Sequence, residues 1–332
     1  MFIVNNYFLA VVFCVITMLC WGSWGNTQKL AGKTWRYELF YWDYVIGILL
    51  FSLISAFTLG SIGTEGRSFL NDLFQAEWGN IGSAFLGGII FNAANILLSA
   101  AISIAGLSVA FPVGIGLALV LGVIINYIGA AKGDPVLLFC GVALVTLAII
   151  LNALAYKKLT AKTKKVSSKG IMISLIAGLL MSFFYRFIAA SMDLENFISP
   201  AAGKMTPYTA MFIFACGIFA SNFVFNTIAM KKPFEGSAVN YREYFKGFKI
   251  HLVGILGGLI WGLGNAFNLI AAGKAGAAVS YGLGQGATLV SAFWGVIIWK
   301  EFKEAPESTN KYLYAMFALF LFGIGLIIAA GA

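Results

Sequence analysis

The sequence is poor in charged residues. Only 11% of its 332 residues are charged and 60% are hydrophobic, whereas about 25% of the residues of soluble domains carry a charge. One membrane span needs about 20 consecutive apolar residues, so ten spans occupy about 200 residues. This composition excludes a soluble enzyme and leaves no room for a sizeable water-soluble domain.

Histidine and cysteine are also scarce. The single histidine, His251, excludes metal sites built from several histidines, and alone at a helix start it indicates a structural or interfacial residue. The four cysteines lie in apolar runs without a CxxC pair, which predicts buried free thiols; they are Cys14, Cys20, Cys140 and Cys216. We therefore expect no metal, no cofactor and no enzymatic activity.

Long hydrophobic runs, in contrast, are abundant and predict an all-α polytopic membrane protein. Ten segments qualify: they lie near 5–24, 38–60, 80–103, 107–128, 135–156, 170–191, 206–230, 251–272, 276–299 and 311–331. Met1 leads into the first segment without a basic region or a convincing cleavage site, which favours a first span over a removed signal.

Basic residues are distributed unevenly between the two sides of these segments. Seventeen of the 22 lysines and arginines lie in the connections after the first, fifth, seventh and ninth segments. The positive-inside rule then places these connections in the cytoplasm and both termini on the outer side of a cell inner membrane. The net charge of +9 follows from this loading of one side, so the expected surroundings are the lipid bilayer and not nucleic acid.

The lysine-rich connection 157–169 divides the chain into an N-terminal half, 1–156, and a C-terminal half, 170–332. Five spans in each half give the halves opposite orientations, which predicts two inverted five-helix repeats. Residues 85–120 align with 255–290 at a constant shift of 170 without a gap, and 13 of the 36 positions are identical. The identical pairs include Gly87 with Gly257, Gly88 with Gly258, Asn95 with Asn265 and Gly106 with Gly276. Shared membrane composition is the alternative explanation.

Asparagines inside the apolar segments are the first candidates for a binding site, because burying an amide without a partner costs about 1–3 kcal/mol. Asn92 and Asn95 lie three apart, and Trp261, Asn265 and Asn268 share one face of 251–272. Repeat-built transporters bind solute near the midplane between the repeats. We expect Asn95 and Asn265 to face a central cavity as symmetric hydrogen-bonding groups; the alternative is that both bridge neighbouring helices.

Aromatic residues extend this candidate site. Tyr281 and Gln285 continue the polar face on 276–299, while Trp21, Trp24 and Tyr185 add aromatic surface near the same region. Aromatic walls with a few amides suit a flat or ring-shaped neutral polar solute. The competing interpretation of the two tryptophans is an aromatic belt at the cytoplasmic interface.

Two carboxylates near the start of the second segment are candidates for proton coupling. Asp43 lies about 8 Å into this segment and Glu38 lies one turn closer to the cytoplasm. A partly desolvated carboxylate at that depth can carry a proton. Alternatively, both are helix-terminal charges satisfied by the helix dipole and by Lys33 or Arg36.

Arg186, deep in 170–191, is a candidate charge partner. Its guanidinium has three predicted roles: it pairs with a carboxylate, binds a solute oxygen, or extends to the outer interface near Asp193.

Three segments of the sequence resemble the ureide permease family of the drug/metabolite transporter superfamily, whose fold has ten helices as two inverted sets of five. The similar segments are 41–63 with Asp43-Tyr44, 86–113 with a glycine pair, Asn95 and Gly106-Leu107-Ser108-Val109, and 290–302 with Phe293-Trp294-Gly295. Plant members carry a long central loop with a phosphate-loop-like motif, whereas this chain has only 157–169 there. Nucleotide regulation is therefore not expected.

The resemblance implies proton-driven import of a small neutral nitrogen-rich solute such as allantoin, uracil or xanthine. Bacterial relatives on the same fold, the glucose uptake and rhamnose–proton symporter families, carry sugars, so monosaccharide uptake is an alternative. Export of metabolites or drugs is a second alternative, since topology does not fix the direction of transport. An intramembrane enzyme or receptor is disfavoured because no catalytic constellation lies within the spans. The oligomeric state stays open.

Overall fold

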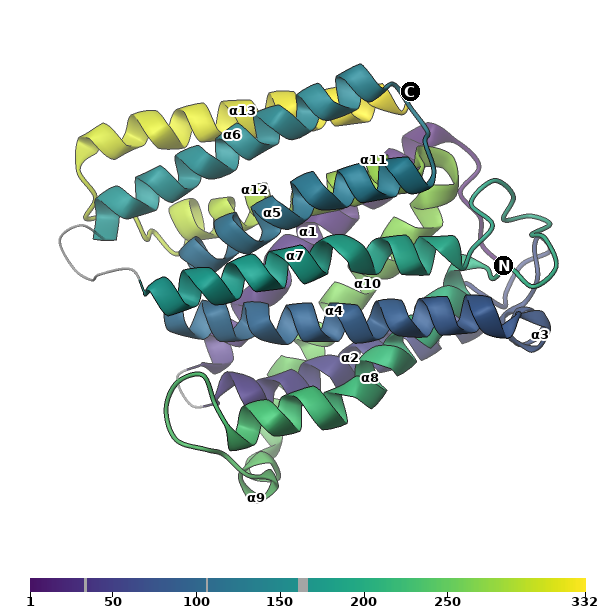
Figure 1. Cartoon of the computed structure of the whole chain (residues 1–332), viewed down its shortest axis with the longest axis horizontal. Coiled ribbons are helices and arrows are strands. Elements are labelled where there is room, and N and C mark those ends of the chain that lie inside the picture. Colours follow the sequence, from purple (N-terminus) through teal and green to yellow (C-terminus); the bar gives the residue numbers. More distant parts are fainter. Residues whose placement is uncertain (33–34, 106, 161–166) are drawn as a thin grey trace.

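The computed structural model describes residues 1–32, 35–105, 107–160 and 167–332, and all regular structure in these residues is helical (Figure 1). The long helices are α1 (Tyr7–Ala31), α2 (Tyr37–Phe57), α4 (Trp78–Ala105), α5 (Leu107–Gly129), α6 (Pro135–Thr160), α7 (Ser168–Ala190), α8 (Pro207–Lys231), α10 (Phe248–Ala275) and α13 (Asn310–Ala330). The remaining apolar segment is divided into α11 (Ala277–Gln285), α12 (Ala287–Phe293) and a π-helical turn, η1 (Trp294–Ile298). Short helices lie in three connections: α3 (Phe69–Gln75), α9 (Tyr241–Tyr244) and η2 (Glu307–Thr309).

Nine helical stretches in the described part of the chain are long and apolar enough to cross a membrane: the long helices other than α5, and the run Ala277–Ile298 that α11, α12 and η1 form together. The chain is therefore a multi-pass membrane protein. The expected segment 107–128 falls on α5, whose described apolar stretch, Val113–Gly129, is shorter than a span. The count of ten spans therefore stays a prediction. Residues 33–34, 106 and 161–166 lie outside the described residues, and with them Lys33, Gly106 and six of the 13 residues of the predicted central connection.

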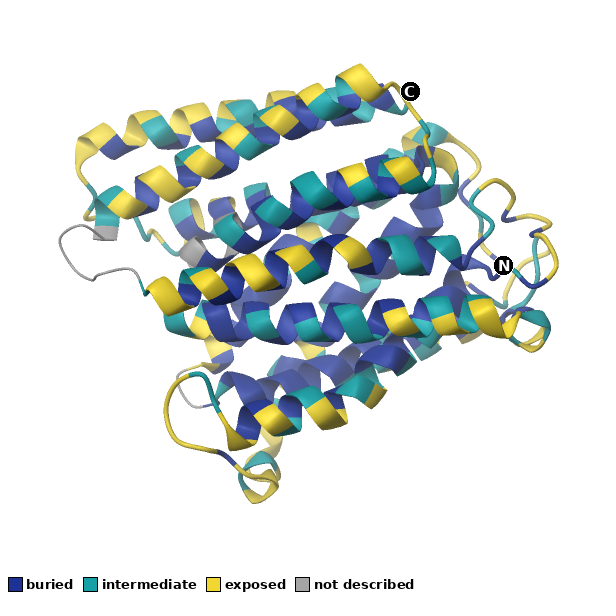
Figure 2. Cartoon of the chain, in the orientation of Figure 1, coloured by how far each residue is buried: buried dark blue, intermediate teal, exposed yellow. Residues whose placement is uncertain are grey.

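The bundle has two ends of different composition. The terminal end holds both chain termini and α3, and the opposite, lysine-rich end holds α9, the end of α6 and the start of α7 (Figure 1). Asn6 caps α1 at the terminal end by accepting a hydrogen bond from the backbone N–H of Leu9, 2.8 Å away. Along the outer faces of the helices many apolar side chains are exposed (Figure 2), including Ile128, Leu321 and Phe322. Such faces suit lipid, because the helices satisfy their own backbone hydrogen bonds.

The helices of the two halves pack in matching combinations. α1 packs against α10 and α4 against α7, so the first span of each half lies beside the third span of the other. α2 packs against α10 and α4 against α8, so the second span of each half also lies beside the third span of the other.

Two glycine contacts show how close these helices approach. A Cβ atom on Gly258 would lie 2.0 Å from the Tyr44 carbonyl oxygen and 2.8 Å from the Gly47 Cα. A Cβ atom on Gly88 would lie 2.1 Å from the Phe214 carbonyl oxygen and 3.1 Å from the Gly217 Cα. Only glycine permits helices to cross this closely. The two contacts correspond at the shift of 170, which relates Gly88 to Gly258 and Gly47 to Gly217.

The expectation of buried cysteines is partly wrong. All four thiols are free, and Cys14 is buried, but Cys20 and Cys216 are half-buried and Cys140 is exposed on α6. An apolar run does not distinguish a core-facing position from a lipid-facing one, because in a membrane protein both faces are apolar.

Candidate functional site

A small cavity lined by buried residues lies between the halves, about midway along the helices. Its volume is about 30 Å³, enough for water but far below the roughly 300–1,000 Å³ of typical ligand pockets. The cavity is lined from both halves by Trp21, Trp24, Phe91, Asn95, Leu98, Ile115, Met181, Phe184, Trp261, Gln285 and Ala287. The structure thus has a narrow central chamber with aromatic walls.

The aromatic walls form a connected stack. The rings of Trp21 and Trp261 are parallel within 7° with centroids 5.8 Å apart, and the Phe91 ring lies 4.3 Å from Trp261. Phe184 meets Phe91 edge-on at 5.2 Å. Because Trp21 and Trp24 are buried inside the bundle, the alternative interpretation of an aromatic belt is wrong for these two residues.

Two amides from different halves complete the lining. The Asn95 Nδ2 donates to the Tyr41 hydroxyl oxygen at 3.3 Å, and Gln285 ends α11 where the helix is interrupted at Gly286. Discontinuous helices commonly form transporter binding sites. The pair gives the chamber hydrogen-bond donors and acceptors without a net charge, which suits a neutral polar solute.

Three other predicted site residues form a hydrogen-bonded layer beside the chamber, toward the terminal end. The Tyr281 hydroxyl lies 3.1 and 3.2 Å from the carbonyl oxygens of Ala118 and Met181. The Tyr185 hydroxyl lies 3.4 Å from the Asn268 carbonyl oxygen, and the Asn268 amide donates to the Ser280 carbonyl at 2.8 Å. These side chains join helices and do not line the chamber.

Asn92 and Asn265 also join helices. The Asn92 amide donates to the Ser221 hydroxyl on α8 at 2.9 Å. The Asn265 amide donates to the Met211 sulfur at 2.9 Å. Its counterpart in the other half, Asn95, donates to Tyr41, and Tyr41 and Met211 are themselves 170 positions apart. The matched asparagines therefore occupy matched contacts, yet only Asn95 lines the chamber.

Most of the apolar lining was not predicted from the sequence. Phe91 is aligned with Trp261 at the shift of 170, so the repeat itself offered a signal for it. Ile115, the counterpart of Gln285, offered the same signal. Leu98, Met181, Phe184 and Ala287 resemble any other residue of an apolar helix.

A wide vestibule opens at the lysine-rich end. Its volume is about 560 Å³, and residues from α1, α4 and the α8–α10 connection line it, among them Gln28, Trp35 and Ile102. The Gln28 amide donates to the Ser99 carbonyl oxygen at 3.2 Å. On α1, Gly25 of the vestibule directly follows Trp24 of the chamber, and on α4, Ile102 of the vestibule lies one turn beyond Leu98 of the chamber. No more than about 6 Å of helix therefore separates the vestibule from the chamber.

The terminal end has a smaller hollow and a thicker barrier. The hollow has a volume of about 320 Å³ and is lined by Gly273 and Lys274 among others. Along α10, twelve residues separate Gly273 from Trp261 in the chamber, which corresponds to about 18 Å of helix. The layer of Tyr185, Tyr281 and Asn268 lies between the two.

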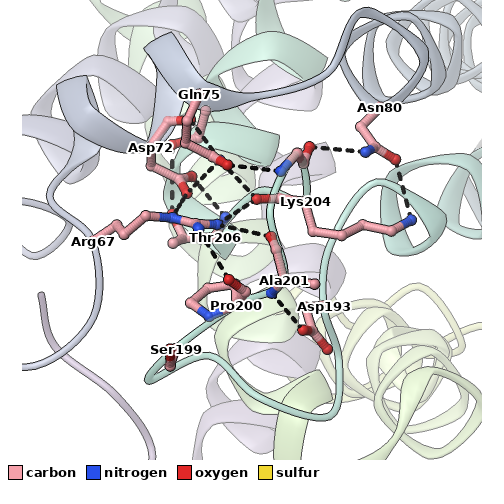
Figure 3. A network of polar contacts seen from close by, with 12 residues as sticks. Arg67, Asp72, Gln75, Asn80, Asp193, Ser199, Pro200, Ala201, Lys204 and Thr206 are labelled. Carbon is pink, nitrogen blue, oxygen red and sulfur yellow. Dashed lines mark hydrogen bonds and ion pairs between the residues drawn. The ribbon is translucent and has the colours of Figure 1, made fainter.

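A polar network closes the surface of the terminal end (Figure 3). The fully buried Asp72 carboxylate pairs with the Arg67 Nε at 2.9 Å and accepts from the Thr206 backbone N–H at 2.7 Å. The Arg67 guanidinium also donates to the carbonyl oxygens of Pro200 and Lys204 at 2.9 and 2.6 Å. The network therefore ties the α2–α3 connection to the α7–α8 connection.

Asp43 forms a cluster with two residues that sequence reasoning did not connect to it. Its Oδ1 accepts from the Tyr244 hydroxyl at 2.6 Å and lies 2.8 Å from the His251 Nδ1. Burial, and then the nearby Asp43 carboxylate, raise the pKa of Tyr244 above its usual range, so its hydroxyl remains a donor. A lone histidine at a helix start was the only signal, because nothing in the sequence relates position 43 to position 251.

The two other charged candidates, Glu38 and Arg186, lie apart from the chamber lining. The fully buried Glu38 carboxylate pairs with the Arg36 guanidinium at 2.6 Å, one of the two basic partners expected for it. Arg186 lies against Gly129 on α5. The Asp193 carboxylate instead accepts from the backbone N–H groups of Glu195 and Ala201.

Within the described residues, no group of three or more His, Cys, Asp or Glu side chains is placed to hold a metal ion.

A family model and several similar proteins connect the chain to one family. The family model described as ureide permease matches residues 40–169 and 154–330. Ureide permease 2 of Arabidopsis thaliana is 24% identical over 394 aligned residues, covering 99% of each chain, and ureide permease 4 is similar to the same extent over 397. A putative sugar uptake protein of Streptococcus pyogenes serotype M1 is 25% identical, covering 90% of this chain and 91% of its own.

A solved crystal structure has a similar fold. Its TM-score is 0.63 at 14% sequence identity, and the match covers 96% of this chain and 95% of the other. With a family model matching most of its length, the chain belongs to the ureide permease family and is a transporter rather than an enzyme.

Proposed function

We propose that the protein is a secondary transporter that imports a small neutral polar solute by alternating access, with the central chamber as the solute site. The supporting observation is the chamber itself. Amides and aromatic rings from both halves meet in an uncharged cavity, and a short barrier on one side and a long one on the other separate it from the two ends.

The proposed architecture is ten spans arranged as two inverted repeats, 1–156 and 170–332, with the lysine-rich end in the cytoplasm and both termini outside the inner membrane. Its support is the exchange of partners between the halves. First and third spans pair across the halves in both directions, and the Gly47–Gly258 and Gly88–Gly217 contacts are related by the shift of 170.

The proposed solute class is ureides and nucleobases of the allantoin, uracil or xanthine type. Relatives named ureide permeases support it, as do flat aromatic walls with two amides. A monosaccharide is the second candidate, because a relative is named as a putative sugar uptake protein and indole and amide groups also suit a sugar ring. Export in place of import is the remaining alternative for direction.

Proton coupling at Asp43 is part of the proposal. Asp43 is buried to 1% exposure on α2, between Tyr41 and Tyr44. Tyr41 bonds Asn95 in the chamber, and the Tyr44 ring lies 4.7 Å from Trp24. A change of charge at Asp43 therefore acts on α2 next to two chamber residues. Glu38, already paired with Arg36, is the weaker candidate.

Uptake into proteoliposomes tests this function. With an imposed inward proton gradient, radiolabelled allantoin, uracil, xanthine, glucose and rhamnose are offered in turn, and one class is expected to accumulate. Asp43→Asn should abolish gradient-driven accumulation yet preserve counterflow exchange, which needs no net proton movement. No accumulation of any of these solutes would reject proton-coupled import of these classes, and unchanged accumulation in Asp43→Asn would exclude Asp43 from the coupling.

A further inference from the structure

The Asp43 cluster lies outside the chamber, near the lysine-rich end. It consists of the Asp43 carboxylate on α2, the Tyr244 hydroxyl on α9 and the His251 imidazole at the start of α10. Gly254 permits this approach, since a Cβ atom there would lie 2.4 Å from the Asp43 Cβ. The Asp43 Oδ2 is buried and accepts no hydrogen bond within the described residues. The Trp35 side chain is a further neighbour of this carboxylate.

A single aromatic ring separates the cluster from the vestibule. The Trp35 ring meets the His251 ring edge-on at 5.2 Å and lies 6.3 Å from the Tyr244 ring. Trp35 is also part of the vestibule wall, and the His251 side chain is 16% exposed. Protons from water at the lysine-rich end thus have a short route to the imidazole.

The charge on the cluster depends on one proton. Tyr244 faces Asp43 from α9 and His251 from α10, while Arg36 and Glu38, at the same end of α2, pair with each other. With an added proton, the carboxylate and imidazole together carry no net charge, and without it they carry a charge of −1. Two groups this close titrate as one coupled unit.

We propose that His251 and Asp43 act together as the proton-exchange site of the transporter, and that the site exchanges its proton with the vestibule at the lysine-rich end. The inference rests on the proposed proton-coupled function and names a second residue for it. His251 lies in the first turn of α10, which also carries Trp261 in the chamber. The helix that holds Asp43, α2, contacts the chamber residues Asn95 and Trp24 through Tyr41 and Tyr44.

The pair exists at one end only. At the shift of 170, Asp43 corresponds to Ile213 and His251 to Ile81. An isoleucine side chain cannot bind or release a proton. An exchange site at a single end gives the transport cycle one protonation step that the other half does not repeat.

A titration of the single histidine tests the pair without any transport assay. Protein labelled with ¹⁵N-histidine and held in lipid nanodiscs gives imidazole signals from His251 alone, and their pH dependence is followed by NMR. Asp43→Asn should move the titration midpoint to lower pH by about one unit or more, because it removes a negative charge in contact with the imidazole. Tyr244→Phe, which keeps the carboxylate and the ring, is the matched control and should leave most of that interaction.

A midpoint that is unchanged in Asp43→Asn would overturn the pair. In proteoliposomes, His251→Gln should shift or flatten the pH profile of gradient-driven uptake while counterflow continues. An unaltered profile would overturn the role of His251 and leave proton-coupled import through Asp43 standing. Absence of gradient-driven uptake in the wild type would instead remove the function on which the role depends.

Discussion

The two ends of the molecule close the central chamber to different depths. At the terminal end about 18 Å of helix, a layer of tyrosine and asparagine hydrogen bonds and the Arg67–Asp72 network lie outside the chamber. At the lysine-rich end about 6 Å of helix and the Gln28–Ser99 hydrogen bond separate it from a vestibule of about 560 Å³. Two halves with matched helix contacts thus support an asymmetric conformation, in which the chamber is close to opening at the lysine-rich end.

The buried carboxylates of the two ends follow the same division. Asp72 at the terminal end is paired with an arginine, which stays charged at every physiological pH. Asp43 at the lysine-rich end is paired with a histidine, a side chain that is charged only when protonated. The terminal end therefore has a pair with a permanently charged partner, and the lysine-rich end has the pair that we propose as the proton-exchange site. Replacing residues on either side tests whether this contrast is real.

The largest effect is expected at the terminal end, from Asp72→Ala. Removing one partner of a buried pair costs about 3 kcal/mol, the low end of the usual range, because Arg67 keeps some contact with water. The apparent melting temperature in detergent should fall by about 5 °C or more. Asp193→Ala is the control, because Asp193 binds only backbone N–H groups in the same region. Equal melting temperatures for the two variants would show that the network does not hold this end closed.

A smaller effect is expected in the chamber, from Asn95→Ala. Loss of one amide that hydrogen-bonds the solute should weaken solute affinity about tenfold, as measured by thermal shift or equilibrium binding. Asn265→Ala removes the matched asparagine, which does not line the chamber, and should change affinity less than about twofold while lowering stability. Equal losses of affinity in both variants would contradict the assignment of the chamber as the solute site.

The smallest effect is expected at the lysine-rich end, from Gln28→Ala. A net hydrogen-bond contribution of about 1 kcal/mol corresponds to about a fivefold increase in the population of the open state. The readout is the labelling rate of a cysteine introduced at Leu98, in a background without the native cysteines, by a small thiol reagent. The control is Asn26→Ala. Asn26 lies on the same helix as Gln28 but accepts its hydrogen bond from the Trp299 indole, so its replacement should leave the rate unchanged. A faster rate in the control variant alone would place the barrier elsewhere.

The sequence predicted which segments are helical and much of the chamber, since Trp21, Trp24, Asn95, Trp261 and Gln285 all line it. Those positions were accessible because polar and indole groups are conspicuous in apolar helices, and because the shift of 170 relates the halves. The sequence could not distinguish these lining residues from the five other predicted site residues, which join helices instead. Whether an amide such as Asn268 faces a cavity or a neighbouring carbonyl depends on helix rotation, which hydropathy does not determine in a bundle with apolar surroundings.

Contacts between distant segments were beyond sequence reasoning. The approach of His251 to Asp43 depends on how α10 crosses α2 at Gly254, and the barrier at Gln28 depends on its distance to a backbone carbonyl of α4. Neither relation has a periodicity or motif. The shift of 170 relates contacts in one half to contacts in the other, but it does not predict the conformational difference between the two ends.

The most direct test of this account is two-sided labelling of the Leu98→Cys variant in oriented vesicles, in the same cysteine-free background. A membrane-impermeant thiol reagent applied to the lysine-rich face should label the chamber cysteine, and bound solute should slow that labelling. The same reagent applied to the terminal face should label it at least tenfold more slowly. Labelling that is equal from both faces, or faster from the terminal face, would contradict the central claim that the chamber lies close to opening at the lysine-rich end.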